Sequence, residues 1–141
     1  MVLSQGESYS LNGLGNAYNS LGQYQTAIDF YQQSLKITRE IGDVQGESYS
    51  LNGLGNAYNS LGQYQTAIDF YQQSLKIKRE IGDVGGESAS LIGLGNAYNS
   101  LGQYQTAIDF YQQSLKITRE IGDVRGEATA WFNLGLVLEK V

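Results

Sequence analysis

A sequence unit is repeated along the chain almost without change, and this repeat limits the fold more than any other feature. The three full copies occupy residues 5–44, 45–84 and 85–124, and a fourth copy begins at 125–141 and stops partway. A period of 40 residues is typical of elongated arrays in which each unit packs mainly on its neighbours. The repeat therefore predicts one domain over residues 1–141, made of about three and a half units.

Each unit contains two helical patterns of apolar residues. In the first pattern, Leu11, Leu14 and Tyr18 recur at spacings of three and four residues, which places them on one face. The second pattern has two apolar faces, so we expect that helix to pack on its own partner and on the next unit. Strand-like alternation is absent, and the predicted class is all-α. The expected helices are residues 5–20, 24–41, 44–60, 64–81, 84–100, 104–121 and 124–139.

Glycine and aspartate indicate where these helices begin and end. Gly42 follows the last apolar position of the second helix, where a left-handed C-cap favours glycine. Asp43 follows it and is expected to cap the next helix. Within the first helix, Gly15 is expected to let Ala27 of the partner helix approach closely. Gly13 has no reason of this kind in the sequence.

Composition excludes most familiar enzymes. The chain has no His and no Cys, which removes histidine bases, thiol nucleophiles and the usual zinc ligands. Its recurring carboxylates, such as Asp29 and Glu40, are expected to form ordinary surface ion pairs. We therefore expect no catalytic residues, no metal site, no cofactor and no enzyme activity.

Charge and hydropathy narrow the partners further. A net charge of −5 argues against nucleic acid, whose binding depends on Lys and Arg at phosphates. No apolar run is long enough to span a membrane, and residues 1–4 lack the pattern of a signal peptide. We expect a cytoplasmic protein that binds neither nucleic acid nor membrane.

The repeat resembles the tetratricopeptide repeat (TPR). The motifs that carry the resemblance are Leu11-x2-Leu14-Gly15-x2-Tyr18, Ala27-x3-Tyr31 and, in the last unit, Trp131-x2-Leu134-Gly135. The proline that usually follows the second helix is missing, and its absence accounts for the longer period. Repeats of this length that carry Leu-Gly-Asn are similar to those of spindle-orientation adaptors and of bacterial, especially cyanobacterial, arrays. The resemblance implies a right-handed superhelical solenoid of antiparallel helix pairs, with seven helices, that binds proteins or peptides.

The second and third copies differ at four positions. The pairs are Gln45/Gly85, Tyr49/Ala89, Asn52/Ile92 and Lys78/Thr118. The first three pairs lie on one stripe of the first helix, and in tetratricopeptide folds this face lines the concave groove. We therefore interpret the stripe as a ligand-binding surface. Drift between copies, or a changed last unit that terminates the array, would also produce such differences.

Extending this stripe gives the candidate groove residues. They are Tyr9, Asn12, Asn16 and Asn19 in the first copy, Tyr49, Asn52, Asn56 and Asn59 in the second, Ala89, Ile92, Asn96 and Asn99 in the third, and Thr129, Phe132 and Leu136 in the last. The groove is thus expected to change from polar and aromatic to apolar, to match a ligand with a polar segment followed by an apolar one. Related families hold an extended peptide through asparagines at the positions of Asn16, Asn56 and Asn96. A carboxamide has one acceptor and two donors and can pair with both the C=O and the N–H of such a peptide.

The last helix suggests a different role. Its residues Trp131, Leu134 and Leu138 are expected to face a partner helix that the fourth copy lacks, which leaves an apolar stripe open to self-association. The leading hypothesis is a protein-interaction scaffold that binds an extended peptide. The alternative is a structural module that stacks end to end, with near-identical copies produced by recent amplification or by design. A homo-oligomer through the last helix would fit that alternative.

Overall fold

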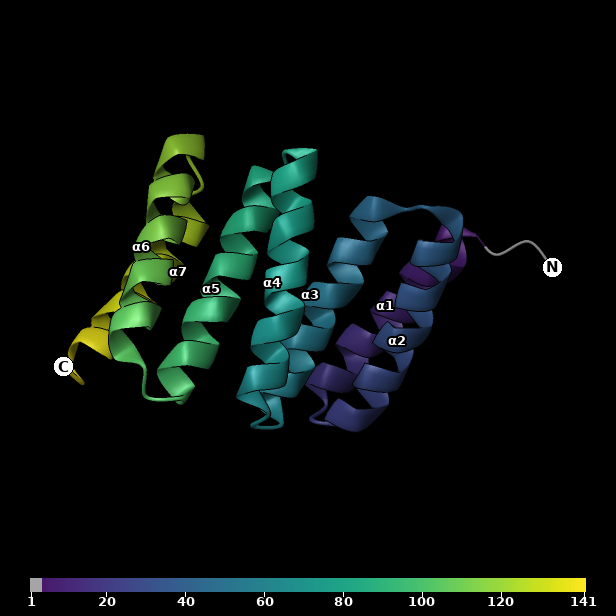
Figure 1. Cartoon of the computed structure of the whole chain (residues 1–141), viewed down its shortest axis with the longest axis horizontal. Helices are drawn as coiled ribbons and strands as arrows, with labels where there is room; N and C mark the ends of the chain where they lie inside the picture. Colours follow the sequence, from purple (N-terminus) through teal and green to yellow (C-terminus); the bar gives the residue numbers. More distant parts are fainter. Residues whose placement is uncertain (1–3) are drawn as a thin grey trace.

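The computed structural model describes residues 4–141, which form seven α-helices arranged as successive antiparallel pairs (Figure 1). The helices are α1 (Gln5–Ser20), α2 (Tyr24–Ile41), α3 (Val44–Ser60), α4 (Tyr64–Ile81), α5 (Val84–Ser100), α6 (Tyr104–Ile121) and α7 (Val124–Leu138). The expected all-α class, the pairing and the helix ranges are confirmed, except that α7 ends one residue earlier than expected.

The caps explain why the helices begin and end where they do. Gly42 adopts the left-handed conformation with a φ of 72°, which ends α2. The side chain of Asp43 then accepts a hydrogen bond from the backbone N–H of Gly46, 3.0 Å away, and so caps α3. The same glycine and aspartate recur at the two later junctions between units. One local signal, repeated three times, therefore fixes the connection between successive units.

The first helices of the units form an inner layer. Helices α1, α3, α5 and α7 approach one another closely in sequence, whereas within residues 4–141 the backbones of the second helices α2, α4 and α6 do not come close to each other. Helices that touch on one side and spread apart on the other produce a curved array. The first helices consequently lie on its concave side and the second helices on its outer side. Figure 1 shows the helices side by side along the long axis of the array.

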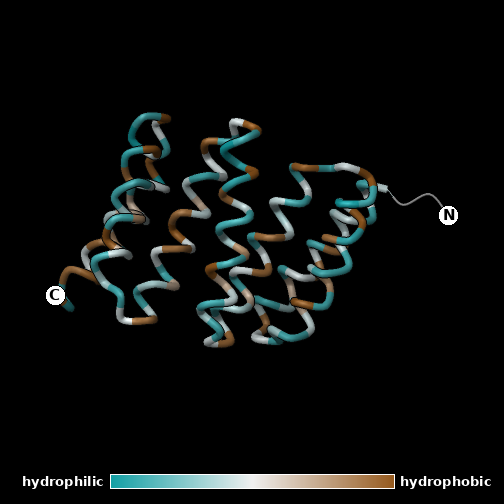
Figure 2. Tube along the Cα trace, viewed as in Figure 1, coloured by the Kyte–Doolittle hydropathy of each residue, from teal (hydrophilic) through white to brown (hydrophobic). Residues whose placement is uncertain are grey.

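The hydrophobic core is shared between neighbouring units. One cluster joins buried residues of α2 to buried residues of α3, namely Ala27, Ile28, Tyr31, Leu35, Leu51, Leu54 and Ala57. Helices α4 and α5 repeat this cluster, and a smaller one joins α6 to α7. Hydrophobic positions therefore recur at intervals in every helix, and none is hydrophobic along its whole length (Figure 2). Each unit completes its core only with its neighbour, as expected for a repeat array.

A buried tyrosine of each second helix explains both glycines of the first helix. A Cβ atom at Gly15 would lie 2.6 Å from the ring of Tyr31, and one at Gly53 of the next unit would lie 2.5 Å from the same ring. The expected reason for Gly15 was wrong, because the ring of Tyr31 and not Ala27 occupies the space. A Cβ at Gly13 would meet nothing within 4 Å. Its copies at later positions receive the tyrosine ring of the preceding unit.

The leucine at the position of Leu14 packs on the preceding unit. Leu14 is 43% exposed although its own partner helix is present, whereas its copy Leu54 is fully buried. Leu54 packs in the cluster that contains residues of the preceding second helix. This leucine thus joins units and does not join the two helices of one unit.

The recurring charges form ion pairs between helices. Arg39 pairs with Glu47 at 3.1 Å, and the later copies repeat this pair across each junction. The arginine side chains are about half exposed, so each pair contributes little to stability. None of the helices described for residues 4–141 is long and apolar enough to cross a membrane.

Candidate functional site

Three hollows follow one another along the concave side. The first, of about 320 Å³, lies between α1 and α3. The second, of about 370 Å³, lies between α3 and α5 and shares Asn16 and Tyr49 with the first. The third, of about 390 Å³, reaches α7 and shares Asn52 and Asn56 with the second. Because neighbouring hollows share walls, together they form one groove along the array.

Many of the predicted groove residues line these hollows. They are Tyr9, Asn12, Asn16, Tyr49, Asn52, Asn56, Ala89, Ile92, Asn96 and Thr129. Asn19, Asn59 and Asn99 line none of the three, because they lie at the ends of the first helices next to the turns. Phe132 and Leu136 also lie outside the hollows and are exposed. The hollows are therefore lined by the first three of the four predicted positions in each full unit and by only the first position in the last unit.

Asn12 is placed differently from expectation, because it is only 2% exposed. Its Oδ1 accepts a hydrogen bond from the hydroxyl of Ser50, 3.0 Å away, and so joins α1 to α3. Asn52 and Ser90 repeat this contact at the next junction. Asn12 therefore lies in the floor of the groove and joins helices, and it is not freely available to a ligand.

The third junction replaces this polar pair by an apolar one. Ile92 occupies the position of Asn12 and Asn52, and Ala130 occupies that of the two serines. Ile92 is partly buried against the last core cluster, and Ala130 is fully buried. The change from asparagine to isoleucine is thus matched by a change in the partner helix, and it makes this part of the groove apolar.

Buried tyrosines hold the carboxamides of Asn16, Asn56 and Asn96, which together are called the asparagine ladder below. The hydroxyl of Tyr71 donates to Oδ1 of Asn56 at 2.5 Å, and that of Tyr111 donates to Oδ1 of Asn96 at 2.6 Å. Tyr31 makes the same bond to Asn16. Burial raises the pKa of Tyr111 to about 12, so its hydroxyl keeps its proton at neutral pH. Each amide oxygen consequently accepts one hydrogen bond from a tyrosine, which fixes the orientation of the carboxamide.

The ladder differs from one unit to the next. Nδ2 of Asn16 donates to the hydroxyl of Tyr49, 3.1 Å away. Ala89 replaces this tyrosine in the next unit. Among residues 4–141, Nδ2 of Asn56 and Nδ2 of Asn96 have no hydrogen-bond partner. Asn56 is an exposed residue, and Asn96 is partly exposed. The side-chain N–H groups therefore have no partner at two of the three positions, and the pairing with a peptide backbone stays a prediction.

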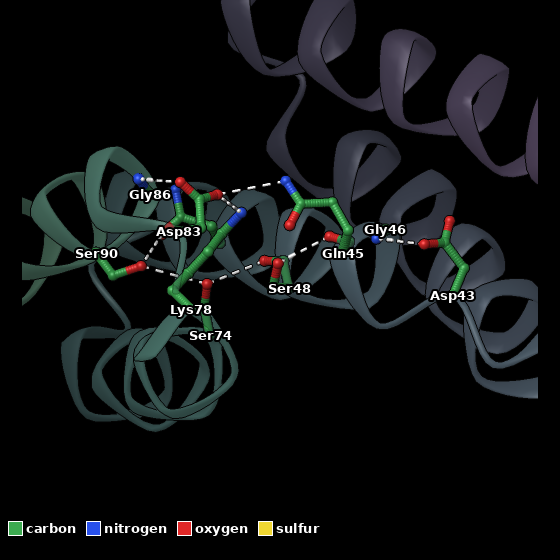
Figure 3. A network of polar contacts seen from close by, with 10 residues as sticks. Asp43, Gln45, Gly46, Ser48, Ser74, Lys78, Asp83, Gly86 and Ser90 are labelled. Carbon is green, nitrogen blue, oxygen red and sulfur yellow. Dashed lines mark hydrogen bonds and ion pairs between the residues drawn. The ribbon is translucent and has the colours of Figure 1, made fainter. Parts of the chain in front are cut away.

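Lys78 and Asp83 contribute charges that the predicted stripe did not include. Lys78 extends from α4 and donates from Nζ to Asp83, 2.8 Å away, and Gln45 of α3 donates to the same carboxylate at 3.3 Å (Figure 3). The hydrogen bond from Lys78, followed by that from the N–H of Gly86, lowers the pKa of Asp83. Lys78 itself is only 6% exposed. The pair is therefore fixed at the wall of the groove.

All four positions that distinguish the second copy from the third meet in one place. Gln45, Tyr49, Asn52 and Lys78 all line the second hollow. Their replacements Gly85, Ala89 and Ile92 line the third hollow. Lys78 seemed unrelated to the stripe because it belongs to the other helix, but the length of its side chain brings it to the groove. Random drift over the whole unit would not concentrate the changes at one surface.

The last helix has an open apolar side. Trp131 and Leu138 are each 49% exposed, and the guanidinium of Arg119 lies 5.0 Å from the centre of the Trp131 ring. Leu134, expected on the same open side, is instead buried against α6. A Cβ at Gly135 would meet nothing within 4 Å, whereas the equivalent glycines of the full units meet a tyrosine ring. The open side is therefore smaller than expected.

The repeat family is recognised along almost the whole sequence. The tetratricopeptide repeat family matches residues 7–80 and 87–141. The chain belongs to this family. The family comprises helical arrays that generally mediate protein–protein interactions, and the matches identify no catalytic family. No curated protein matches the sequence.

Solved structures with the same fold are distant in sequence. The TPR domain of Arabidopsis FLU is 20% identical, with a TM-score of 0.78 over 82% of this chain and 98% of that one. Nearly identical TPR-like repeats of a putative kinesin light chain from Podosopora anserina are 22% identical, with a TM-score of 0.80 over 95% and 67%. The TPR2AB domain of yeast Sti1 in its pHSP90 complex is 24% identical, with a TM-score of 0.80 over 97% and 48%. These likenesses concern the fold alone.

Proposed function

We propose that this protein is an interaction scaffold that holds an extended peptide in its concave groove. The side-chain N–H groups of Asn56 and Asn96 donate to backbone carbonyl oxygens of the peptide. The observation that carries this proposal is that both amides have their oxygens bonded to tyrosine and their nitrogens free in the groove. A carboxamide fixed in this way loses little side-chain entropy when a ligand binds.

The nature of the groove supports a peptide with two different ends. Tyr9 and Tyr49 border the first hollow, whereas Ala89 and Ile92 border the third. The peptide therefore places polar or aromatic contacts near α1 and an apolar segment near α7.

The yeast Sti1 domain, whose structure is of a pHSP90 complex, shares this fold and supports a protein as the partner. The Leu-Gly-Asn motifs, similar to those of spindle-orientation adaptors and bacterial arrays, favour the same mode. The expected cytoplasmic location stays a prediction.

The test uses substitutions that remove only the donors. Asn56→Asp and Asn96→Asp keep an oxygen for the tyrosine hydroxyls and lose the N–H groups. The probe is a random peptide library displayed on phage, and recovered peptides are measured by fluorescence anisotropy. We expect affinity to fall at least about tenfold, since each lost hydrogen bond contributes about 0.5–1.5 kcal/mol and the carboxylates repel carbonyl oxygens.

A control separates this effect from added charge. Gln32→Glu and Gln33→Glu add the same two charges on the exposed outer side of α2, and they should leave affinity unchanged. Recovered peptides that bind both double variants equally well would refute the groove assignment. Equal melting temperatures of the two variants would show that the aspartates have not disturbed the fold.

A second role, self-association, is favoured by the open side of α7. Trp131 and Leu138 expose apolar surface on the same helix as Gly135, where a Cβ would meet nothing within 4 Å. Such surfaces commonly mediate association. Light scattering at millimolar concentration compares the parent with a Trp131→Gln, Leu138→Gln variant. Oligomers that disappear in the variant support this role, and a monomeric parent excludes it.

A further inference from the structure

An aspartate carboxylate caps the helix at each junction, and two of these aspartates, Asp83 and Asp123, line the groove. Asp43, Asp83 and Asp123 each accept a hydrogen bond from a backbone N–H of the helix that they cap, at 2.9–3.0 Å. Each carboxylate retains a second oxygen that is not used by the cap. What this oxygen receives differs among the three junctions, although the backbone around it is the same.

Asp43 has one side-chain donor and Asp83 has two, whereas Asp123 has none within residues 4–141. Asp83 accepts from Lys78 at 2.8 Å and from Gln45 at 3.3 Å. Asp43 accepts from Gln5 at 3.2 Å. Asp123 accepts from no side chain within residues 4–141. Gly85 and Thr118, which stand where the second unit has Gln45 and Lys78, supply no such donor.

The same substitutions leave space beside Asp123. The hollow of about 390 Å³ at this junction is lined by Asp123 together with Gly85, Ala89 and Ile92. In the second unit, Gln45 and Tyr49 stand at the positions of Gly85 and Ala89, and they line the second hollow together with Lys78. The hollow thus combines an apolar wall with a carboxylate that has a free oxygen.

We propose that this hollow binds a lysine or arginine side chain of the peptide ligand. Its aliphatic stem lies against Ala89 and Ile92, and its cationic group donates to Asp123. This inference rests on the proposed peptide-binding function. The protein contains its own precedent, because the ammonium of Lys78 binds the equivalent carboxylate of Asp83 (Figure 3). A charged donor is favoured over a neutral one since charge-assisted hydrogen bonds are about twice as strong.

Charge in the surroundings modulates this site. Arg125 also lines the hollow, but it forms no ion pair with Asp123 in the described part of the chain. Its positive charge opposes a cationic ligand, while the net charge of −5 favours one. Removing the charge of Arg125 should therefore strengthen the preference for a basic residue.

The experiment again uses a random peptide library displayed on phage. We expect the parent to enrich one lysine or arginine position, and Asp123→Asn, which keeps the cap, to lose that enrichment with about tenfold weaker binding of the parent-selected peptides. Thr118→Lys should do the same, because it recreates the internal ammonium that the second unit already accommodates. Arg125→Gln should increase the enrichment. The matched control Asp43→Asn should leave it unchanged.

The outcomes separate this inference from the function on which it rests. Peptides that depend on Asn56 and Asn96 but show no basic position, or that keep it in Asp123→Asn, overturn the inference and leave the groove in place. A library that yields no peptide dependent on those asparagines overturns both.

Discussion

The contact between glycine and tyrosine at each junction leads to a prediction with an internal control. Gly13 and Gly93 occupy the same position in two copies of the unit, and both lie in the middle of a helix. A Cβ at Gly93 would lie 2.4, 2.6 and 2.8 Å from three atoms of the Tyr71 ring, whereas a Cβ at Gly13 would meet nothing within 4 Å. The substitutions Gly93→Ala and Gly13→Ala should therefore change stability in opposite directions.

The magnitudes follow from two competing effects. Alanine stabilises the interior of a helix by about 0.8–1.0 kcal/mol relative to glycine, and at Gly13 this gain stands alone. At Gly93 the ring cannot move away, because Tyr71 is only 2% exposed. Insertion of a methyl group into such a packed site costs about 1–3 kcal/mol or more. Because the gain from alanine in a helix applies to both variants and cancels, they should differ by the cost of overpacking, roughly 1–3 kcal/mol in the free energy of unfolding.

Urea denaturation followed by circular dichroism measures both free energies. A third variant, Gly93→Ala with Tyr71→Leu, removes the ring, and the alanine should then cost much less than it does beside tyrosine. If Gly93→Ala stabilises the protein as much as Gly13→Ala does, the tyrosine ring does not fill the space between units and the explanation of these glycines is wrong.

Three further predictions concern charge, pH and modularity. Asp83→Ala should destabilise the protein by about 1–3 kcal/mol more than Asp43→Ala. Both variants lose a helix cap, but only Asp83→Ala leaves the buried ammonium of Lys78 unpaired. Thermal melts of the two variants give the comparison. Burial, with a smaller contribution from a neighbouring tyrosine, raises the pKa of Tyr31 to about 12 from 10.0. The folded state therefore holds the proton of Tyr31 more tightly than the unfolded state does. The stability that this group contributes is complete below pH 10 and is lost as the pH rises toward 12, by up to about 1.4 kcal/mol per pH unit. Denaturation at several alkaline pH values should show this decline, and a flat profile would contradict it. Deletion of residues 45–84 should leave a folded, less stable protein, since the new junction again places glycines against a buried tyrosine; loss of the helical circular dichroism signal would show that the units are not modular.

The sequence was sufficient to predict the array because the same local signals recur in each copy. Gly42 and Asp43 mark each junction, and their roles depend only on backbone conformation and a nearby N–H. Contacts between units were harder to predict. The spacing of Leu14 and Gly15 shows that they share a helical face with apolar residues, but it does not reveal whether the neighbour is the helix of the same unit or of the preceding one.

The groove was partly predictable for a similar reason. Helical periodicity correctly grouped Tyr49, Asn52 and Asn56, because they belong to one helix. It could not include Lys78, which reaches the groove from another helix. It could not include Asp123 either, because the sequence indicates that this residue caps a helix but not what its second oxygen contacts. The partial burial of the asparagine oxygens was also not apparent, because the tyrosines that bind them lie fifteen residues away in the chain.

The central claim, that Asn56 and Asn96 bind the backbone of a peptide, is tested most directly by NMR of the side-chain amide protons. Asn56→Asp and Asn96→Asp variants assign the two pairs of resonances, which the repeated sequence would otherwise leave ambiguous. On addition of a library-selected peptide, both pairs should move downfield, as expected for new hydrogen bonds, while the amide of Asn16, already bonded to Tyr49, should move less. Resonances of Asn56 and Asn96 that stay in place while the peptide binds at saturation would contradict the account.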